Sequence, residues 1–427
     1  MSKILLAYYG DDFTGSTDAL EFITRAGAKA VLFTETPTAE QLKSFPDLDA
    51  YGVAGKTRAL PPDEMEKILL PAFEQMKANG ADHVHYKVCS TFDSSPTVGS
   101  IGKAIDCGAE VFNNKTIPVL GGTPALGRFC AFGNLFAKMG IGSEGKIYRL
   151  DRHPSMSTHP STPMNESDLR LHIGKQTNRT IGLIDFTQLK KEVTGWNCDD
   201  AIVLVDALSI NHLERIGEWL NYLQNDQPLF TVGSSAVEMA LGMHWNNGGL
   251  LTPKTEFDTI EKVVPLLVIS GSCSPVTTAQ IEYAKANGFE EVILDATAIC
   301  NNENVEANAV TDLLLEQKNV VVHTGTRQAA NLSAEKLGTV LGAIARNAVE
   351  QTNIKRVVVS GGDTSSYAAR AMQIDAVEMV APIVIGAPLC KAYSANKAMD
   401  GLEVNFKGGQ VGSENYFKLM SLGSDQL

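Results

Sequence analysis

The segment 356–372 places three consecutive valines before two glycines and an alanine-rich run. Consecutive β-branched residues predict a strand buried on both faces, and the alanines predict a helix that can pack closely on a sheet. Between them, Gly361 and Gly362 permit positive φ and leave backbone N–H groups uncovered, while Thr364 or Ser365 can cap the helix. The start of such a helix can bind a phosphate group. A tight turn without a ligand is the alternative at this point.

Asp363 follows directly after the two glycines. A carboxylate at a phosphate site repels the anion unless it binds Mg2+ or accepts a proton from an attacking hydroxyl group. We therefore predict that Asp363 is a catalytic residue.

Strand, turn and helix follow one another in this way along most of the chain. Repeated units of this kind predict parallel sheets covered by helices, and 427 residues exceed what one core usually serves. We predict two Rossmann-like α/β domains with mainly parallel sheets that face a shared cleft. The predicted N-terminal domain is 1–245, the C-terminal domain is 246–427, and the junction lies in the weakly periodic segment 245–262.

Composition excludes some classes of partner. The net charge of −13 and the lack of a basic tract argue against nucleic acid. No apolar run approaches the ~20 residues that span a bilayer, and the N-terminal segment turns acidic at Asp11 instead of reaching a cleavage site. We therefore predict a cytoplasmic protein without a membrane partner. Its 7 cysteines are scattered, which predicts reduced core residues.

Charged and hydroxyl-bearing residues follow several predicted strands, and the ends of parallel strands are where ligand groups gather. The adjacent carboxylates of Asp11 and Asp12 repel each other unless a cation, a hydroxyl group or a role as base stabilises them. Asp12 is therefore a second predicted catalytic residue, whereas Asp18 is expected only to cap a helix. Two cations with several hydroxyl groups suit a small polyhydroxylated carboxylate. The predicted substrate-binding residues are Asp11, Asp12, Arg58, Lys87, Ser90, Thr91 and Asp93.

Three strands of the C-terminal half end in Gly, Ser and Thr, at 270–274, 324–326 and 360–364. Turns of this composition present N–H and hydroxyl groups to phosphates without a P-loop, and no G-x-x-x-x-G-K-[ST] motif occurs. A second glycine cluster at 408–412 can close over a nucleotide. The predicted nucleotide-binding residues are Ser272, Ser274, Gly361, Gly362, Asp363, Thr364, Gly408, Gly409 and Gln410.

The run 140–145 matches the dinucleotide fingerprint G-x-G-x-x-G letter for letter. That fingerprint needs a buried strand before its first glycine, whereas we predict a helix over 129–139 and therefore a helix C-cap and loop. A capping box at 165–168 predicts a further helix start. His153 and His159 lack the spacing and the third ligand of a zinc site, so no metal-ligating residue is predicted.

Four motifs occur in order over nearly the whole chain: Asp-Asp-Phe-Thr-Gly at 11–15, Tyr-Lys-Val-Cys-Ser-Thr-Phe-Asp-Ser at 86–94, Gly-Ser-Cys-Ser at 271–274 and Ser-Gly-Gly-Asp-Thr at 360–364. Together they resemble the four-carbon acid sugar kinase family, formerly a domain of unknown function. The resemblance implies an N-terminal acid-sugar domain, a C-terminal nucleotide domain and ATP-dependent phosphorylation of the terminal hydroxyl group of 3-oxo-tetronate, D-threonate or D-erythronate.

The resemblance also implies roles for residues at matching positions. Ser274, the turn 361–364 and the Gly408 region would contact ATP. The region of Asp12, Arg58, Lys87 and Ser90 would hold the sugar acid. Gln410 and Val411 depart from the Lys-x-Gly-x-Phe-Gly pattern of the family.

The expected reaction is in-line transfer of the γ-phosphoryl group, with Mg2+ bridging the phosphates. The expected partners are ATP, the sugar acid and a second copy of the chain in a homodimer. Two alternatives come from other classes. A non-catalytic two-lobed sugar-acid-binding protein would bind the acid and release no ADP, and an NAD-dependent hydroxy-acid oxidoreductase would change nicotinamide absorbance.

Overall fold

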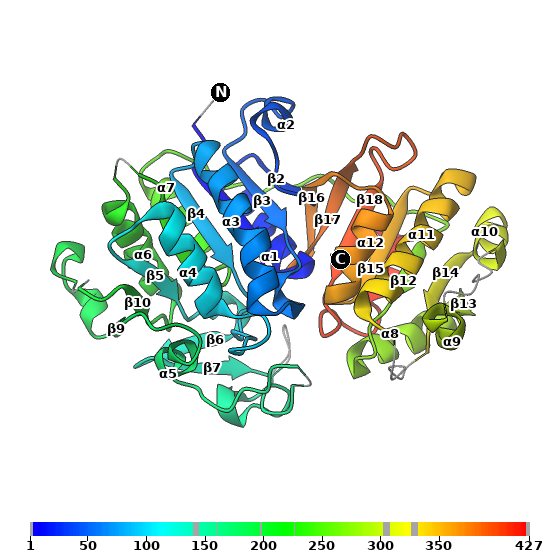
Figure 1. Cartoon of the computed structure of the whole chain (residues 1–427). Helices are drawn as coiled ribbons and strands as arrows, with labels where there is room; N and C mark the ends of the chain where they lie inside the picture. The colour runs from blue at the N-terminus through cyan, green and yellow to red at the C-terminus, as the bar shows by residue number, and fades with distance from the viewer. Residues whose placement is uncertain are drawn as a thin grey trace. The chain divides into compact units, whose positions relative to one another are not determined.

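The computed structural model describes residues 3–139, 145–159, 161–196, 199–225, 227–301, 308–325 and 332–423 (Figure 1). The chain divides into two compact units. The first comprises Met1–Val31 and Glu35–Thr255, and the second comprises Leu32–Thr34 and Glu256–Leu427. Each unit is built on a mainly parallel sheet, so the prediction of two α/β domains with mainly parallel sheets is confirmed.

The sheet of the first unit has the strand order β3-β1-β4-β11-β5-β10-β9, and every pair of neighbours is parallel. Most of its strands are fully buried because helices cover both faces, which explains their continuous apolar runs. The strands are β1 (Leu6–Gly10), β3 (Ala50–Ala54), β4 (His83–Lys87), β5 (Ile117–Leu120), β9 (Ile181–Ile184), β10 (Ile202–Val205) and β11 (Leu229–Gly233).

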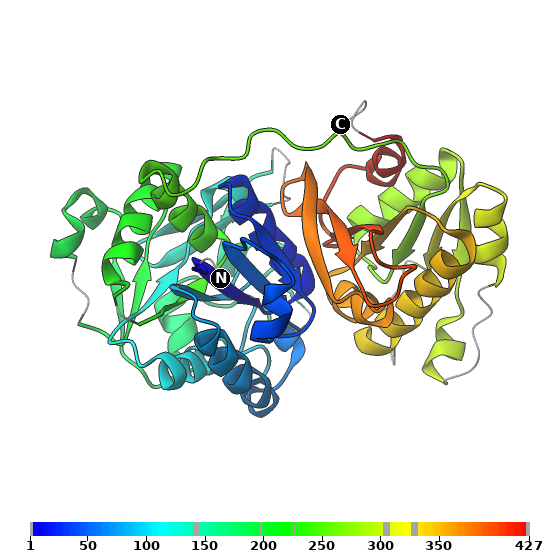
Figure 2. The same cartoon turned by 90° about the horizontal axis from the view of Figure 1, so that it is seen from above.

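The helices of the first unit form two layers. α3 packs on α4, while α7 packs on both α1 and α6. The two sets lie on opposite faces of the sheet, as Figure 2 shows. The helices are α1 (Phe13–Arg25), α2 (Ala39–Lys43), α3 (Pro62–Ala78), α4 (Ile101–Phe112), α5 (Leu169–Gly174), α6 (Ile210–Leu223) and α7 (Ala236–Asn247).

The prediction of a helix over 129–139 is wrong. This part of the chain forms the antiparallel strands β6 (Arg128–Ala131) and β7 (Asn134–Lys138), and β8 (Ile147–Arg149) pairs with β7. Phe132 and Gly133, with φ of 51° and 81°, turn the chain between β6 and β7. The alternation of buried and half-buried residues in both strands is the period-2 pattern of a sheet with one covered face. The capping box at 165–168 is also not formed, because Asp168 caps α5.

The sheet of the second unit has the strand order β13-β14-β12-β15-β18-β17-β16. Neighbours from β13 to β18 are parallel, and β17 pairs antiparallel with both β18 and β16. Residues 32–34 belong to this unit because Leu32 and Phe33, in β2 (Ala30–Phe33), pair with β16. The strands are β12 (Leu267–Ser270), β13 (Phe289–Ile293), β14 (Asn319–His323), β15 (Arg356–Ser360), β16 (Ala376–Val384), β17 (Ala387–Tyr393) and β18 (Glu403–Lys407).

Helices also cover both faces of this second sheet. α11 packs on α10 and α12, and α13 packs on α8, which lies beside it in Figure 2. The core under α8 and α13 includes Val268, Val358 and Phe417, so the valines of 356–360 are buried as predicted. The helices are α8 (Pro275–Ala286), α9 (Ala296–Cys300), α10 (Asn308–Leu315), α11 (Ala334–Thr352), α12 (Gly362–Ala371) and α13 (Tyr416–Leu422).

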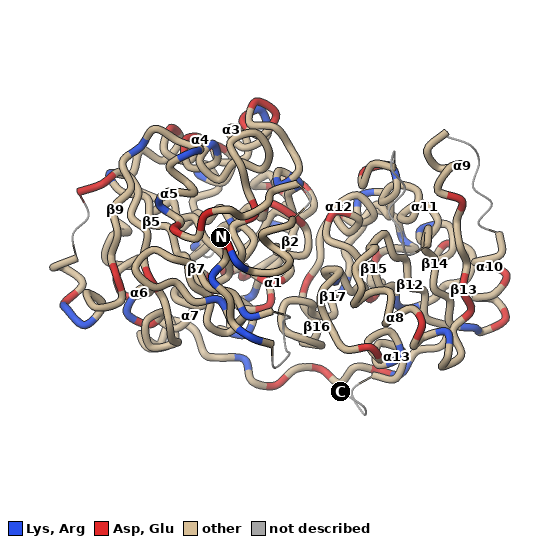
Figure 3. Tube along the Cα trace, turned by 90° about the horizontal axis from the view of Figure 1, so that it is seen from below, with Lys and Arg blue, Asp and Glu red and all other residues tan. Residues whose placement is uncertain are grey.

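Charged residues of both signs are interspersed over the described chain (Figure 3). Among the described helices, none combines the length and the apolar composition that a membrane span requires.

Candidate active site

Asp11 and Asp12 directly follow β1, and the Arg58 guanidinium group joins their carboxylates. Its Nη2 lies 2.7 Å from Asp11 Oδ1, and its Nη1 lies 2.7 Å from Asp12 Oδ2. Both aspartates are buried, at 3% and 2% exposed. The structure thus brings three predicted substrate-binding residues together. Because Arg58 already pairs with two carboxylates, it is suited to hold them in place rather than to bind another acid.

Burial and neighbouring charges shift the pKa values of this group. Burial disfavours the charged form of Arg58, but Asp11 and Asp12 raise its pKa well above the ordinary value. Burial raises the pKa of Asp11, and the charge of Arg58 counteracts part of that shift. The Asp11 carboxylate therefore depends on Arg58 to stay ionised in its buried position.

Asp12 also caps α1. Its Oδ1 accepts a hydrogen bond from the Gly15 N–H group at 2.7 Å, and its Oδ2 accepts one from Thr14 Oγ1 at 3.0 Å. A Cβ atom at Gly15 would lie 2.6 Å from Asp12 Oδ1 and 3.3 Å from Lys87 Nζ, so glycine allows these charges to approach. The prediction that Asp18 caps a helix is wrong, because Asp18 lies inside α1 and Asp12 is the cap.

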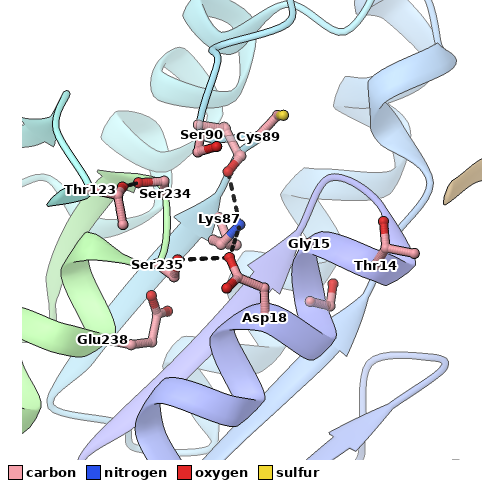
Figure 4. Close-up of polar contacts among 12 residues, drawn as sticks. Thr14, Gly15, Asp18, Lys87, Cys89, Ser90, Thr123, Ser234, Ser235 and Glu238 are labelled. Atoms are coloured by element: carbon pink, nitrogen blue, oxygen red, sulfur yellow. Dashed lines mark hydrogen bonds and ion pairs between the residues drawn. The ribbon is translucent and has the colours of Figure 1, made fainter. Parts of the chain in front are cut away.

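Lys87 ends β4 and is buried beside Asp18 (Figure 4). Its Nζ lies 3.5 Å from Asp18 Oδ2 and donates a hydrogen bond to the Val88 carbonyl, while Ser235 Oγ donates to the same aspartate oxygen at 2.7 Å. Burial alone would lower the pKa of Lys87, but Asp18 and Asp11 raise it. Lys87 is therefore a buried, fixed positive charge. The sequence did not indicate Asp18 as its partner, since the two are far apart along the chain.

Ser90, Thr91 and Asp93 follow β4 and are buried. Thr91 Oγ1 donates to Asp93 Oδ1 at 2.7 Å, and Cys89 Sγ lies 3.0 Å from Thr91 Oγ1. These contacts hold the turn in shape. Ser90 faces a different partner: its Oγ accepts a hydrogen bond from Arg128 Nε at 3.0 Å. Figure 4 shows the side chain of Ser90 in the same group as Lys87 and Cys89.

Arg128 was not among the predicted site residues, and the segment 129–139 that follows it was predicted to be a helix. It lies in β6, is 8% exposed, and makes no ion pair within the described ranges. Its guanidinium group donates to Ser90 Oγ and to the Leu126 carbonyl. Burial lowers its pKa. A buried cation with only neutral partners is costly, and an acidic ligand would compensate it.

Thr123 and Ser234 were not among the predicted substrate-binding residues. They follow β5 and β11, and their hydroxyl groups form a hydrogen bond with each other. Figure 4 shows them in the same group of polar side chains as Ser90 and Lys87. The available signal was their position: Thr123 lies three residues after β5 and Ser234 directly after β11, two neighbouring strands of the same parallel sheet.

The second candidate site lies in the second unit, where β14, β12, β15 and β18 are consecutive neighbours in the sheet. Their carboxyl ends surround a cavity of about 210 Å³. The prediction that three strands ending in Gly, Ser and Thr meet at one edge is confirmed by this order, although Thr326 lies outside the described residues. The lining residues are Gly271, Ser272, Cys273, Thr324, Leu332, Ala334, Leu337, Gly361, Gly362, Asp363, Thr364 and Gly409.

Two glycines are required at this cavity. Gly361 has a φ of 127°, a conformation that L side chains rarely adopt. A Cβ atom at Gly271 would lie 2.2 Å from Thr364 Oγ1. The turns before α8 and α12 therefore approach each other in a way that only glycine permits.

The cap of α12 differs from the prediction. Gly361 occupies the N-cap position without a side-chain cap, so the prediction that Thr364 or Ser365 caps this helix is wrong. Ser365 Oγ instead donates to the Gly361 carbonyl at 2.7 Å. Asp363 is exposed in the first turn and lines the cavity. The helix start thus presents backbone N–H groups and one carboxylate to the same space.

The other predicted nucleotide-binding residues lie around this cavity in different ways. Ser274 caps α8, accepting a hydrogen bond from Thr277 N–H, and donates to the Gly409 carbonyl. Gly408 is half-buried and Gln410 is exposed; neither lines the cavity. The glycine run 140–145, which matches the dinucleotide fingerprint, lies outside the described residues except for its last position.

Comparison with known proteins covers both units. Residues 6–241 match the family model described as a sugar-binding N-terminal domain, and residues 267–417 match the one described as a nucleotide-binding C-terminal domain. The first range contains the group around Asp11 and Arg128, and the second contains the cavity beside Asp363.

Individual relatives match over nearly their full length. The chain is 41% identical to the 3-oxo-isoapionate kinase of Paraburkholderia graminis, over 98% of this chain and 94% of that protein. It is 27% identical to the 3-oxo-tetronate kinase of Pseudomonas fluorescens, over 97% and 95%. A crystal structure from Salmonella typhimurium has a TM-score of 0.75 at 24% identity and covers 98% of both chains, which shows a shared fold.

Proposed function

The chain belongs to the four-carbon acid sugar kinase family, and from this premise we propose that it transfers the γ-phosphoryl group of ATP to a hydroxyl group of a 3-oxo sugar acid. One observation carries the proposal: both family matches span a polar site, the first with buried cations and the second with a cavity at a helix start. An acid and a triphosphate are the ligands that such sites bind.

We propose 3-oxo-isoapionate as the first substrate to test. The identity of 41% to a 3-oxo-isoapionate kinase, against 27% to a 3-oxo-tetronate kinase, favours it over 3-oxo-tetronate. D-threonate and D-erythronate, which the family resemblance implied, are tested after the two 3-oxo acids. Neither carries the 3-oxo group that appears in the names of both relatives.

The acid group of the substrate is proposed to bind at Arg128 and Ser90. Arg128 is a buried cation with no carboxylate partner among the described residues, whereas Arg58 already pairs with Asp11 and Asp12. Lys87, held by Asp18, adds positive charge close to Ser90. Thr123 and Ser234 offer hydroxyl groups that suit the polar backbone of a sugar.

The triphosphate is proposed to bind at the cavity of the second unit. The first turn of α12 presents N–H groups there, and these stabilise charge that develops on the phosphoryl oxygens. Asp363 is the carboxylate among the cavity-lining residues. Mg2+ commonly binds proteins through one or two carboxylates plus substrate phosphates, so Asp363 fits it; when bound, Mg2+ would neutralise phosphate charge.

Asp363 is also the first choice for the base that accepts the proton of the attacking hydroxyl group, because it lies at the start of α12. Asp12 is the second choice. Its oxygens already accept hydrogen bonds from Gly15, Thr14 and Arg58, which favours an orienting role over proton transfer.

The test is a coupled assay of ADP release from ATP and Mg2+, with each of the four acids in turn. We expect ADP release with at least one acid and none without an acceptor. If none of the four acids causes ADP release although the purified chain binds one of them, the non-catalytic binding protein is favoured. A change in nicotinamide absorbance with a hydroxy acid and NAD would favour the oxidoreductase.

A further inference from the structure

Lys407 ends β18, and its ammonium group is buried beside the end of β15. The residue is 0% exposed. Its Nζ donates to Ser360 Oγ at 3.1 Å and lies 5.6 Å and 5.7 Å from the ring centroids of Tyr416 and Phe417. A lysine ammonium group has three N–H donors, yet the described residues supply one hydroxyl acceptor, two ring faces and no carboxylate within ion-pair distance. This is an expensive way to bury a charge unless the charge has a use.

Hydroxyl groups connect Lys407 with the cavity. Ser360 Oγ lies 3.5 Å from Thr277 Oγ1. Thr277 Oγ1 in turn lies 3.1 Å from Ser272 Oγ, and Ser272 lines the cavity. Thr277 also lies within hydrogen-bond distance of the Gly409 carbonyl, at 2.9 Å. Three hydroxyl groups therefore run in sequence from the buried ammonium group to the surface of the proposed triphosphate site.

The direction of these hydrogen bonds depends on the charge of Lys407. Each hydroxyl group has one proton to donate. When Nζ is protonated it donates to Ser360, so Ser360 can donate to Thr277. Thr277 then donates its one proton to Ser272 or to the Gly409 carbonyl, and because its oxygen already accepts from Ser360, the Ser272 proton is left for the cavity. A neutral amine can instead accept from Ser360, and the sequence can reverse. The charged form thus favours a hydroxyl donor that faces an anion.

Both forms of Lys407 are accessible near neutral pH, because burial lowers its pKa to about 7. The other groups near this end of β18 change its charge little. On α13, Tyr416 donates its hydroxyl proton to Asn405 Oδ1; α8 contributes Thr277, and α12 contributes Asp363 at the cavity. Arg356 and Glu403 lie at the opposite ends of β15 and β18. An anion in the cavity is therefore the partner that would favour the charged lysine.

Resting on the proposed function, we propose that Lys407 is a positioning residue whose buried charge, relayed by the hydroxyl groups of Ser360 and Thr277, orients Ser272 toward a nucleotide phosphate. Nucleotide binding is then coupled to proton uptake by Lys407, to an extent that depends on pH.

Titration calorimetry of the full chain with ATP and Mg2+, without a sugar acid, measures this proton in buffers of different ionisation enthalpy. With a starting pKa of about 7, uptake should be about 0.9 proton at pH 8 and about 0.1 at pH 6. Lys407→Met should lose the uptake at pH 8 and bind ATP about 10-fold more weakly. Lys355→Met, which changes an exposed lysine just before β15, is the matched control and should behave as the unmodified chain does.

Thr277→Val tests the relay separately, since it removes the hydroxyl group and keeps Lys407. It should reduce both ATP affinity and proton uptake. If Lys407→Met fails to fold, Thr277→Val still tests whether the hydroxyl groups connect Lys407 with the bound nucleotide. Binding of ATP without uptake at pH 8, or uptake that persists in folded Lys407→Met, would overturn the role of Lys407. No binding heat with the unmodified chain would overturn the proposed nucleotide site and this inference with it.

Discussion

Arg128 illustrates how one residue can define the substrate class. Arg128→Met should raise the KM for the sugar acid about 10- to 150-fold, because a hydrogen bond to a charged group contributes about 1.5–3 kcal/mol. The KM for ATP should stay unchanged. Steady-state kinetics with each substrate varied in turn measures both constants. Arg152→Met is the control, since that side chain is 75% exposed and its Nε makes only a long ion pair with Asp151 Oδ2, at 3.7 Å. An unchanged KM for the acid would place the acid group elsewhere.

Asp363 has two possible roles that one variant separates. Asp363→Asn should lower kcat by about 10²- to 10⁴-fold, the usual contribution of a positioned base. If Asp363 is the base, the acidic limb of the pH–rate profile disappears as well. If it holds Mg2+, that limb persists and the Mg2+ concentration for half-maximal activity rises. Asp295→Asn, at the N-cap of α9, controls for loss of a carboxylate at a helix start. Full activity in Asp363→Asn would exclude both roles.

At the scale of an element, α1 depends on Asp12 for its cap and for its connection to Arg58. Asp12→Ala should lower the free energy of unfolding by about 2–4 kcal/mol, because it removes the cap and leaves Arg58 with one carboxylate. Urea denaturation measures the change. Thr38→Ala at the exposed cap of α2 removes only a cap and should cost about 1 kcal/mol. Equal losses in the two variants would show that the ion pair adds no stability.

At the scale of the whole molecule, the two units should respond to different ligands. The 3 tryptophans, Trp196, Trp219 and Trp245, all belong to the first unit, so their fluorescence follows its unfolding. A sugar acid at 100 times its Kd should stabilise this unit by about 2.7 kcal/mol and raise the fluorescence midpoint. ATP with Mg2+ should raise the unfolding midpoint of the second unit. Circular dichroism follows the unfolding of both units, so this shift appears there and not in the fluorescence. Equal shifts of the fluorescence midpoint with either ligand would contradict separate sites.

The buried charge of Lys407 also affects the stability of the whole chain. Burial lowers its pKa from 10.5 to about 7. Below pH 7 both folded and unfolded states hold the proton, so the full cost of burying it applies; as pH rises from 7 toward 10.5 the folded state loses the proton and that cost declines. Lys407→Met should therefore raise the free energy of unfolding by a few kcal/mol at pH 6 and by less at pH 9. Urea denaturation at both pH values checks this, and a gain independent of pH would contradict it.

The local patterns of the sequence predicted much of the fold correctly. Continuous valine runs and glycine turns identified β15 and α12. The segment 129–139, directly after Arg128, was predicted incorrectly as a helix, because Phe132 and Gly133 form a turn whose positive φ values a hydrophobic pattern does not reveal. Arg128, at the start of β6, was not among the predicted site residues.

The sequence by itself determined which residues form strands and turns, since periodicity and glycine placement act through local backbone preferences. Only the tertiary structure decided the partners: that Arg58 joins Asp11 and Asp12, that Asp18 pairs with Lys87, and that Lys407 is buried beside Ser360. The physical reason is that charge, burial and hydrogen bonding depend on distances between residues far apart in the chain, and packing alone sets those distances.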